Sequence, residues 1–209
     1  MRHRLIAAVA ALTLIGTAAQ ASSELDPVGD FLPSFVGDHD ADLDVTSFSV
    51  NYDAGTQSFT LGATFAGDVN PGRPGLYVIG ANTGTGVIRP FAGIGAPNVI
   101  FNRALVIQKT GAGVVSGNPF TATILGNTLT AVIPLAFLPS TGFAPELYGF
   151  NIWPRNGVGS NTQISDFAPN NSTLASVPEP ATWAMLLAGF FGLGGVLRCQ
   201  RAGKTRLTA

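Results

Sequence analysis

Aspartates gather near the start of the chain at a spacing that suits the binding of a cation. A run of alternating acids ends at Asp44, and further aspartates precede it. Side chains two positions apart lie on one face of an extended segment, where neighbouring carboxylates repel one another. Ca²⁺ relieves such repulsion, because it binds roughly six to eight oxygen ligands. Unless this segment is only a solvated acidic loop, the residues expected to bind Ca²⁺ are Asp26, Asp30, Asp38, Asp40 and Asp42.

Residues 148–155 contain a second group of side chains with a chemical use. Apolar side chains alternate along this segment, so one of its faces belongs to the core of a sheet. On the opposite face, Trp153 would stack on a sugar ring, with Asn151 and Arg155 as hydrogen-bonding partners. In the alternative interpretation, Trp153 covers one end of the fold and Arg155 pairs with Asp166.

Side chains suited to catalysis are sparse in this sequence. His39 is the only histidine after the first 21 residues, and the single cysteine, Cys199, leaves no Cys–His pair in the central region. No serine lies in a Gly-x-Ser-x-Gly motif. The acids concentrate near one end of the chain, whereas a glycosidase needs two of them across a cleft. We therefore expect a protein that is not an enzyme and that uses no cofactor other than Ca²⁺.

The charge of the chain excludes nucleic acid as a partner. The sequence has 209 residues, of which only 11% are charged, and its formal net charge is −1. Basic residues cluster at the two ends, so residues 22–176 hold five basic and eleven acidic side chains. A central region with a net charge of −6 repels phosphate backbones. Cations or neutral polymers, such as an extracellular polysaccharide, suit it better.

The elements that would position these groups are short strands separated by turn residues. Apolar side chains alternate at 46–52 and again at 59–65, which predicts a β-hairpin, and Gly126–Asn127 predicts another tight turn. The pattern predicts an all-β fold, either an antiparallel β-sandwich or a jelly roll. About ten strands are expected, and besides the hairpin they are 76–79, 87–91, 99–101, 105–109, 120–125, 129–133, 147–153 and 164–167.

The predicted β-sandwich domain spans residues 22–167. Residues 168–176 follow it, and they are mostly polar, contain Pro169 and show no apolar periodicity. This composition is typical of a linker. We therefore expect it to separate the domain from the C-terminal segment.

The first 21 residues have the three parts of a secretory signal peptide. Basic residues precede an apolar stretch at 5–15, which is too short to span a bilayer. Ala19 and Ala21 supply the small residues of a cleavage site. We expect this signal helix to direct the chain to the Sec translocon. Removal by signal peptidase would leave a mature chain that begins at Ser22.

A second apolar stretch lies near the C-terminus. Residues 181–197 contain no charged side chain, and a helix of this length is at the short limit for crossing a bilayer. Four basic residues follow at once, between 198 and 206. The positive-inside rule then keeps this end in the cytoplasm while residues 22–176 are exported. The sequence predicts a C-terminal transmembrane helix.

The segment just before this helix carries a short motif. The residues of the motif are Val177, Pro178, Glu179 and Pro180, with Trp183 three positions further on. Followed by an apolar helix and a basic cluster, residues 177–209 resemble the PEP-CTERM sorting signal. The resemblance implies recognition by exosortase, which removes the helix after a transient stay in the inner membrane. It also implies delivery to the cell surface or extracellular matrix of a Gram-negative bacterium, whereas the alternative is a plain membrane anchor.

Together these features predict an exported, non-catalytic surface or extracellular-matrix protein. A surface module that binds polysaccharide or ice is the main alternative, and an exported hydrolase is a further one. An ice-binding face would need rows of threonines on a flat sheet. Only Thr121 with Thr123, and Thr128 with Thr130, approach such a row.

Overall fold

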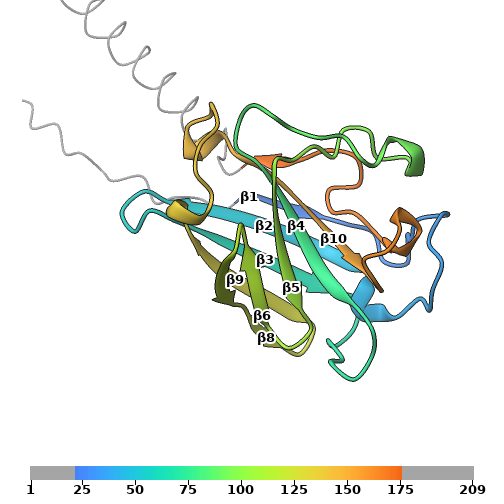
Figure 1. Cartoon of the computed structure of the whole chain (residues 1–209). Coiled ribbons are helices and arrows are strands. Elements are labelled where there is room, and N and C mark those ends of the chain that lie inside the picture. The colour runs from blue at the N-terminus through green and yellow to red at the C-terminus, as the bar shows by residue number, and fades with distance from the viewer. Residues whose placement is uncertain (1–21, 176–209) are drawn as a thin grey trace, which may run out of the picture.

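The computed structural model describes residues 22–175 as two antiparallel β-sheets that pack face to face (Figure 1). These residues form eleven strands and five short 3₁₀ turns, joined by loops. The two packed sheets confirm the predicted all-β class and the sandwich arrangement. No helix within this range is long and apolar enough to cross a membrane. The predicted signal peptide, its cleavage site, the sorting motif and the transmembrane helix lie outside the described residues.

The first sheet contains five strands in the order β1-β2-β3-β9-β8. Strands β2 and β3 form the predicted hairpin, with one irregularity in register between Val45 and Ser47. The predicted turn at Gly126–Asn127 joins β8 to β9. The strands of this sheet are β1 Ser22–Leu25, β2 Val45–Asp53, β3 Ser58–Phe65, β8 Thr123–Leu125 and β9 Thr128–Pro134.

The second sheet contains six strands in the order β11-β10-β4-β5-β6-β7. Strands β4 and β10 lie beside each other along their whole length, although about 70 residues separate them in the sequence. The strands of this sheet are β4 Leu76–Asn82, β5 Arg103–Gln108, β6 Ala112–Val115, β7 Asn118–Thr121, β10 Gly149–Arg155 and β11 Leu174–Ala175.

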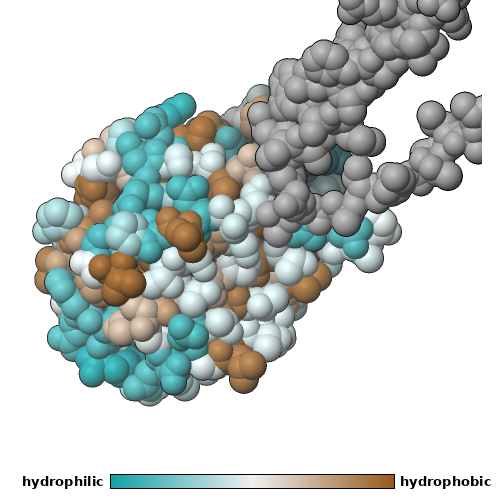
Figure 2. Space-filling view, turned by 180° about the vertical axis from the view of Figure 1, so that it is seen from behind, coloured by the Kyte–Doolittle hydropathy of each residue, from teal (hydrophilic) through white to brown (hydrophobic). Residues whose placement is uncertain are grey.

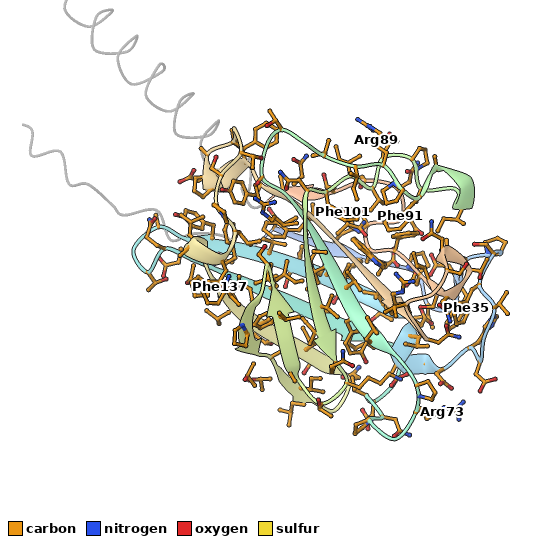
Figure 3. The ribbon with its side chains drawn as sticks, in the orientation of Figure 1. Phe35, Arg73, Arg89, Phe91, Phe101 and Phe137 are labelled. Carbon is orange, nitrogen blue, oxygen red and sulfur yellow. The ribbon has the colours of Figure 1, made fainter. Side chains whose placement is uncertain are left out.

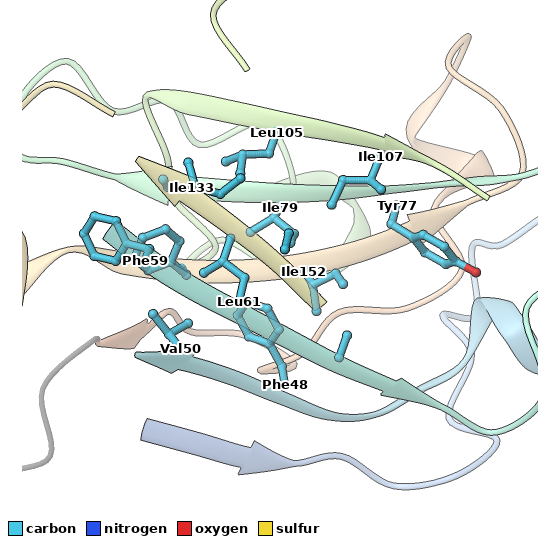
Figure 4. Close-up of a cluster of buried hydrophobic side chains, with 14 of the residues drawn as sticks. Phe48, Val50, Phe59, Leu61, Tyr77, Ile79, Leu105, Ile107, Ile133 and Ile152 are labelled. Atoms are coloured by element: carbon cyan, nitrogen blue, oxygen red, sulfur yellow. The ribbon is translucent and has the colours of Figure 1, made fainter. Parts of the chain in front are cut away.

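The main core lies between the two sheets (Figure 4). In β3 every second side chain is buried, which is the pattern of an antiparallel sheet with one face in the core. The first sheet contributes Phe48, Val50, Phe59, Leu61 and Ile133, each fully buried. The facing side chains of the second sheet are Tyr77, Ile79, Leu105, Ile107 and Ile152.

A smaller core covers the outer face of β4 and β10. Trp153 of β10 contacts Phe91, Phe101 and Phe167 there, with ring centroids 4.9–6.2 Å apart. Figure 3 shows Phe91 and Phe101 on the long loop that lies over this sheet. Because both of its faces are covered, β10 buries six of its seven residues. This explains its nearly continuous apolar sequence.

Four predicted strands differ from the structure. Residues 87–91 and 99–101 form only a single bridge, between Ile88 and Phe101, because this loop packs through aromatic side chains rather than in a ladder. Residues 164–167 are an extended segment that touches β10 through isolated bridges at Ile164 and Ala168. The predicted strand 120–125 is divided at Ala122, where the chain passes from the second sheet to the first.

Residues 168–175, which the sequence assigns to a linker, belong to the folded domain. Ala168 is fully buried and exchanges two backbone hydrogen bonds with Ile152, and β11 pairs with β10. The backbone N–H of Asn98 donates to Oδ1 of Asn171 at 2.9 Å. Asn170 and Asn171 therefore contact the domain through their side chains although both residues are exposed. As a correction, the fold extends past residue 167 to at least Ala175.

Candidate metal centre

Four aspartates from distant parts of the sequence converge where β1 ends and β2 begins. Asp26 and Asp30 follow β1, Asp44 directly precedes β2, and Asp166 comes from the extended segment after β10. We call these four residues the aspartate cluster. Asp26, Asp30 and Asp166 each place a carboxylate oxygen within 4.8 Å of the other two. Two oxygens bound to one Ca²⁺ at about 2.4 Å each are separated by at most about 4.8 Å.

Backbone N–H groups hold the carboxylates of the cluster in place. Gly29 donates to Oδ2 of Asp44 at 2.7 Å. Val45 donates to Oδ2 of Asp166 at 2.9 Å, and Phe167 donates to Oδ1 of the same residue at 2.6 Å. Gly29 has a φ of 83°, a left-handed conformation that glycine adopts readily. This turn brings the segment after β1 back against the start of β2.

Three oxygens of the cluster are buried and have no hydrogen-bond partner. They are Oδ2 of Asp26, Oδ1 of Asp30 and Oδ1 of Asp44. Asp44 is 3% exposed and Asp26 is 9% exposed, so water reaches them poorly. Burying an anionic oxygen without a donor or cation costs several kcal/mol or forces the group to take up a proton. Among these three residues, Asp26 and Asp30 also belong to the group whose carboxylate oxygens lie within 4.8 Å of one another, where one cation could bind both.

The cluster also lacks a basic partner within the described residues, because the three ion pairs of residues 22–175 involve other acids. Burial, followed by the charges of Asp166 and Asp30, raises the pKa of Asp26 to about 8. Burial raises the pKa of Asp166 to about 7, although the N–H of Val45 stabilises its charged form. Burial likewise raises the pKa of Asp44. Without a cation, the cluster therefore retains protons near neutral pH that a cation would displace.

Asn170 joins the cluster from the last part of the domain. Its Nδ2 donates to Oδ1 of Asp26 at 3.0 Å and to Oδ2 of Asp30 at 3.2 Å. These contacts link residues at least 140 positions apart in the sequence. The amide is thus the side chain that bridges the segment after β1 and the segment before β11.

Only part of the predicted calcium site is brought together. Asp38 and Asp40 each form an ion pair of 2.7 Å with Arg73, which Figure 3 places at the edge of the domain. Asp42 turns inward and lies 2.7 Å from Nζ of Lys109. The run does not present one face, because residues 41–43 form a 3₁₀ turn that sends successive carboxylates in different directions. Of the five predicted ligands, only Asp26 and Asp30 therefore belong to the aspartate cluster.

Asp166 and Asn170 are the residues that the sequence did not indicate. A signal for Asp166 exists, because this acid lies between Ser165 and Phe167 in a predicted strand, and a carboxylate in a buried strand needs a partner. Asn170 has no such signal, since an asparagine beside a proline is equally typical of an exposed turn. Its role depends on how the end of the domain folds back.

Of the three predicted sugar-binding residues, Trp153 and Asn151 are buried and Arg155 is partly buried. Trp153 is 2% exposed, with its ring edge-on against Phe91. Asn151 is 1% exposed and donates to the backbone carbonyls of Pro169 and Ser172. Arg155 donates to carbonyl oxygens of the following loop and not to Asp166. As a correction, Trp153 offers no exposed ring face to a sugar.

The outer face of the first sheet is rich in hydroxyl groups. Thr130 lies opposite Gly62 on one side and Thr123 on the other, while Thr128 lies opposite Thr64. Thr121 belongs to the second sheet, so it forms no row with Thr123. Seen from behind, exposed apolar residues stand singly between hydrophilic and neutral ones (Figure 2).

The chemistry of the aspartate cluster follows from its donor atoms. Its four carboxylates supply oxygen ligands, which suit a hard cation such as Ca²⁺, while the amide of Asn170 donates to two of these carboxylates. Comparisons of the chain with models of protein families, with curated proteins and with solved structures found no match.

Proposed function

We propose that the chain is an exported, non-catalytic protein of the cell surface or extracellular matrix, processed through a PEP-CTERM and exosortase route. The observation that carries the proposal is the order of features in the sequence. A signal peptide at 1–21 is followed by the β-sandwich, the motif at 177–180, an apolar stretch at 181–197 and a basic tail. Each feature alone is common, whereas their order is specific to a sorting signal.

The folded domain is compatible with this proposal. Ser22 pairs with Val50 in β1, so cleavage after Ala21 would leave the described residues of this strand in place. At the other end, β11 pairs with β10 up to Ala175, two residues before Val177. Processing at the two predicted sites would therefore keep the sandwich of residues 22–175 intact.

The position of the two ends also supports it. Strand β1 is an edge strand of the first sheet and β11 is an edge strand of the second. These two strands contact each other, so the described chain begins and ends on the same side of the domain. A domain of this shape presents most of its surface away from a membrane to which it is attached by its C-terminal end. The proposed location is the inner membrane transiently and the cell surface or matrix afterwards.

Replacing Glu179 by Ala tests the sorting route. The apolar stretch at 181–197 is unchanged, so membrane insertion is expected to persist, whereas recognition of the motif is expected to fail. The wild-type protein should lack the basic tail in a host that has an exosortase. The Glu179→Ala variant should accumulate in the membrane fraction and keep the tail. Mass spectrometry of both proteins after fractionation of the cells identifies their termini.

Thr182→Ala is the matched control, because it changes the same segment and leaves the Pro-Glu-Pro motif intact. This variant should be processed as the wild type is. If the wild-type protein keeps its C-terminal helix in a host with an exosortase, the proposal fails and a plain membrane anchor remains. A mature chain that still begins at Met1 would overturn the export step.

A further inference from the structure

We propose that the aspartate cluster binds one Ca²⁺ and that this ion fastens the first and last segments of the domain to each other. The proposal does not depend on the sorting route, because it rests on the folded domain alone. It differs from the site that the sequence predicts, since three of the predicted ligands have basic partners of their own.

The size of the site fits a single ion. The carboxylate oxygens of Asp26, Asp30 and Asp166 lie within 4.8 Å of one another, which is the span that one Ca²⁺ bridges. Asp44 is the fourth member, and N–H of Gly29 holds its Oδ2, leaving the buried Oδ1 unpartnered. Carboxylates that bind in a bidentate manner would bring the number of ligands into the range that Ca²⁺ requires.

The unpartnered oxygens are the independent sign of a ligand. Asp44 is 3% exposed and Asp26 is 9% exposed, yet each has one oxygen that accepts no hydrogen bond. Buried acids that only stabilise a fold usually have their oxygens satisfied by donors. Each of these two side chains is more than nine-tenths buried and keeps an oxygen that can bind a cation.

The composition of the cluster favours Ca²⁺ over Mg²⁺. Mg²⁺ usually keeps several water molecules and takes one or two carboxylates. Four carboxylates from irregular segments form a crowded and adaptable set of ligands, which matches the variable geometry of Ca²⁺. Mg²⁺ therefore serves as the reference ion in the experiment.

The position of the site defines what the ion does. It joins the segment after β1, the start of β2 and the segment that leads to β11. Strand β1 has four residues and β11 has two, so neither edge is held by many ladder hydrogen bonds. Like charges in the cluster push these segments apart when no cation is bound. A bound Ca²⁺ attracts the carboxylates of all these segments, and so holds the first and last segments of the described domain together.

Calcium titration of the full chain, purified in detergent and freed of metal with a chelator, tests the proposal. Calorimetry should show one Ca²⁺ per chain, and CaCl₂ at about a hundred times Kd should raise Tm by roughly 5–10 °C. Asp26→Asn should weaken Ca²⁺ binding at least tenfold. Asp38→Asn is the control, because Asp38 is an acid of the same loop that pairs with Arg73. It should bind Ca²⁺ as the wild type does.

The difference in Tm between Asp26→Asn and the wild type should depend on Ca²⁺ if Asp26 is a metal ligand, and should not if Asp26 only stabilises the fold. In chelator, Asp26→Asn should have a Tm at least as high as that of the wild type, because it removes an ionisable carboxyl group from the crowded cluster and keeps the acceptor for Asn170. In Ca²⁺ the order should reverse. No Ca²⁺-dependent shift of the wild-type Tm at millimolar concentration would overturn the proposal. An equal shift with Mg²⁺, or equal loss of binding in Asp38→Asn and Asp26→Asn, would overturn it as well.

Discussion

Two regions of this domain bury carboxylates, but only one of them places a basic side chain beside the acid. Asp42 is 3% exposed and lies 2.7 Å from Nζ of Lys109, whose side chain is equally buried. N–H of Asn70 also donates to Asp42. Two positions along the chain, Asp44 enters the aspartate cluster, where no basic side chain of residues 22–175 forms an ion pair with it. The first region contains its own counter-charge, and the second needs one from solution.

The two regions therefore differ in whether their stability depends on the pH and the cations of the solution. A buried ion pair with additional hydrogen bonds is present whenever the chain is folded, whatever the solvent contains. A group of buried carboxylates is stable only when protons or a cation neutralise it. The structure therefore combines one region that is independent of the medium with one that responds to it. Variants of each region can show whether this contrast is correct.

Breaking the buried pair should have the largest effect. Lys109→Met preserves most of the side-chain volume but leaves Asp42 charged, buried and without its cation. The free energy of unfolding should fall by about 3–5 kcal/mol. Urea unfolding followed by circular dichroism measures this loss, which should be the same in Ca²⁺ and in chelator.

The double variant Asp42→Asn with Lys109→Met provides the control. It removes both charges, so it should recover a large part of the stability that Lys109→Met loses. If the double variant is no more stable than Lys109→Met, the unpaired charge is not the cause of the loss. The two regions would then not differ in the way described above.

The pH dependence of stability should be the next largest effect, and it belongs to the aspartate cluster. The pKa values of Asp26 and Asp166 are raised in the folded state to about 8 and about 7, from an ordinary value of 3.8. The folded protein therefore binds more protons than the unfolded chain between about pH 4 and pH 8. In chelator its stability should fall as the pH rises through this window, by about 2 kcal/mol in total.

Calcium should remove most of this slope, because the ion replaces the protons of the cluster. Thermal unfolding at pH 5, 6, 7 and 8, with Ca²⁺ and with chelator, measures both curves. Stability that rises with pH in chelator would contradict the raised pKa values. Parallel curves in the two conditions would contradict displacement of protons by the ion.

The surface pairs of Arg73 should have the smallest effect. Arg73 contacts Asp38 and Asp40, but its side chain is 46% exposed and that of Asp38 is 81% exposed. Exposed pairs contribute less than about 1 kcal/mol, because water and salt screen them. Arg73→Ala should therefore lower Tm only slightly, and less still at high salt. A loss as large as that of Lys109→Met would show that exposure does not separate the two kinds of ion pair.

Patterns that depend on neighbouring residues could be predicted from the sequence alone. Alternation at 46–52 and 59–65 was sufficient for the hairpin, because a period of two places every second side chain in the core. Gly126–Asn127 was sufficient for the turn between β8 and β9. The signal peptide and the sorting motif stay predictions of the same local kind, because each is inferred from a contiguous stretch of sequence.

Only the tertiary structure decided which acids meet. Asp166 and Asn170 are at least 140 residues from Asp26, and no local pattern relates them. The alternation of Asp38, Asp40 and Asp42 was misleading, because a 3₁₀ turn at 41–43 separates their directions. Trp153 was ambiguous for a similar reason, since a loop distant in sequence covers the outer face of β10. Local periodicity specifies which faces are buried, whereas contacts across the chain specify where charges are brought together.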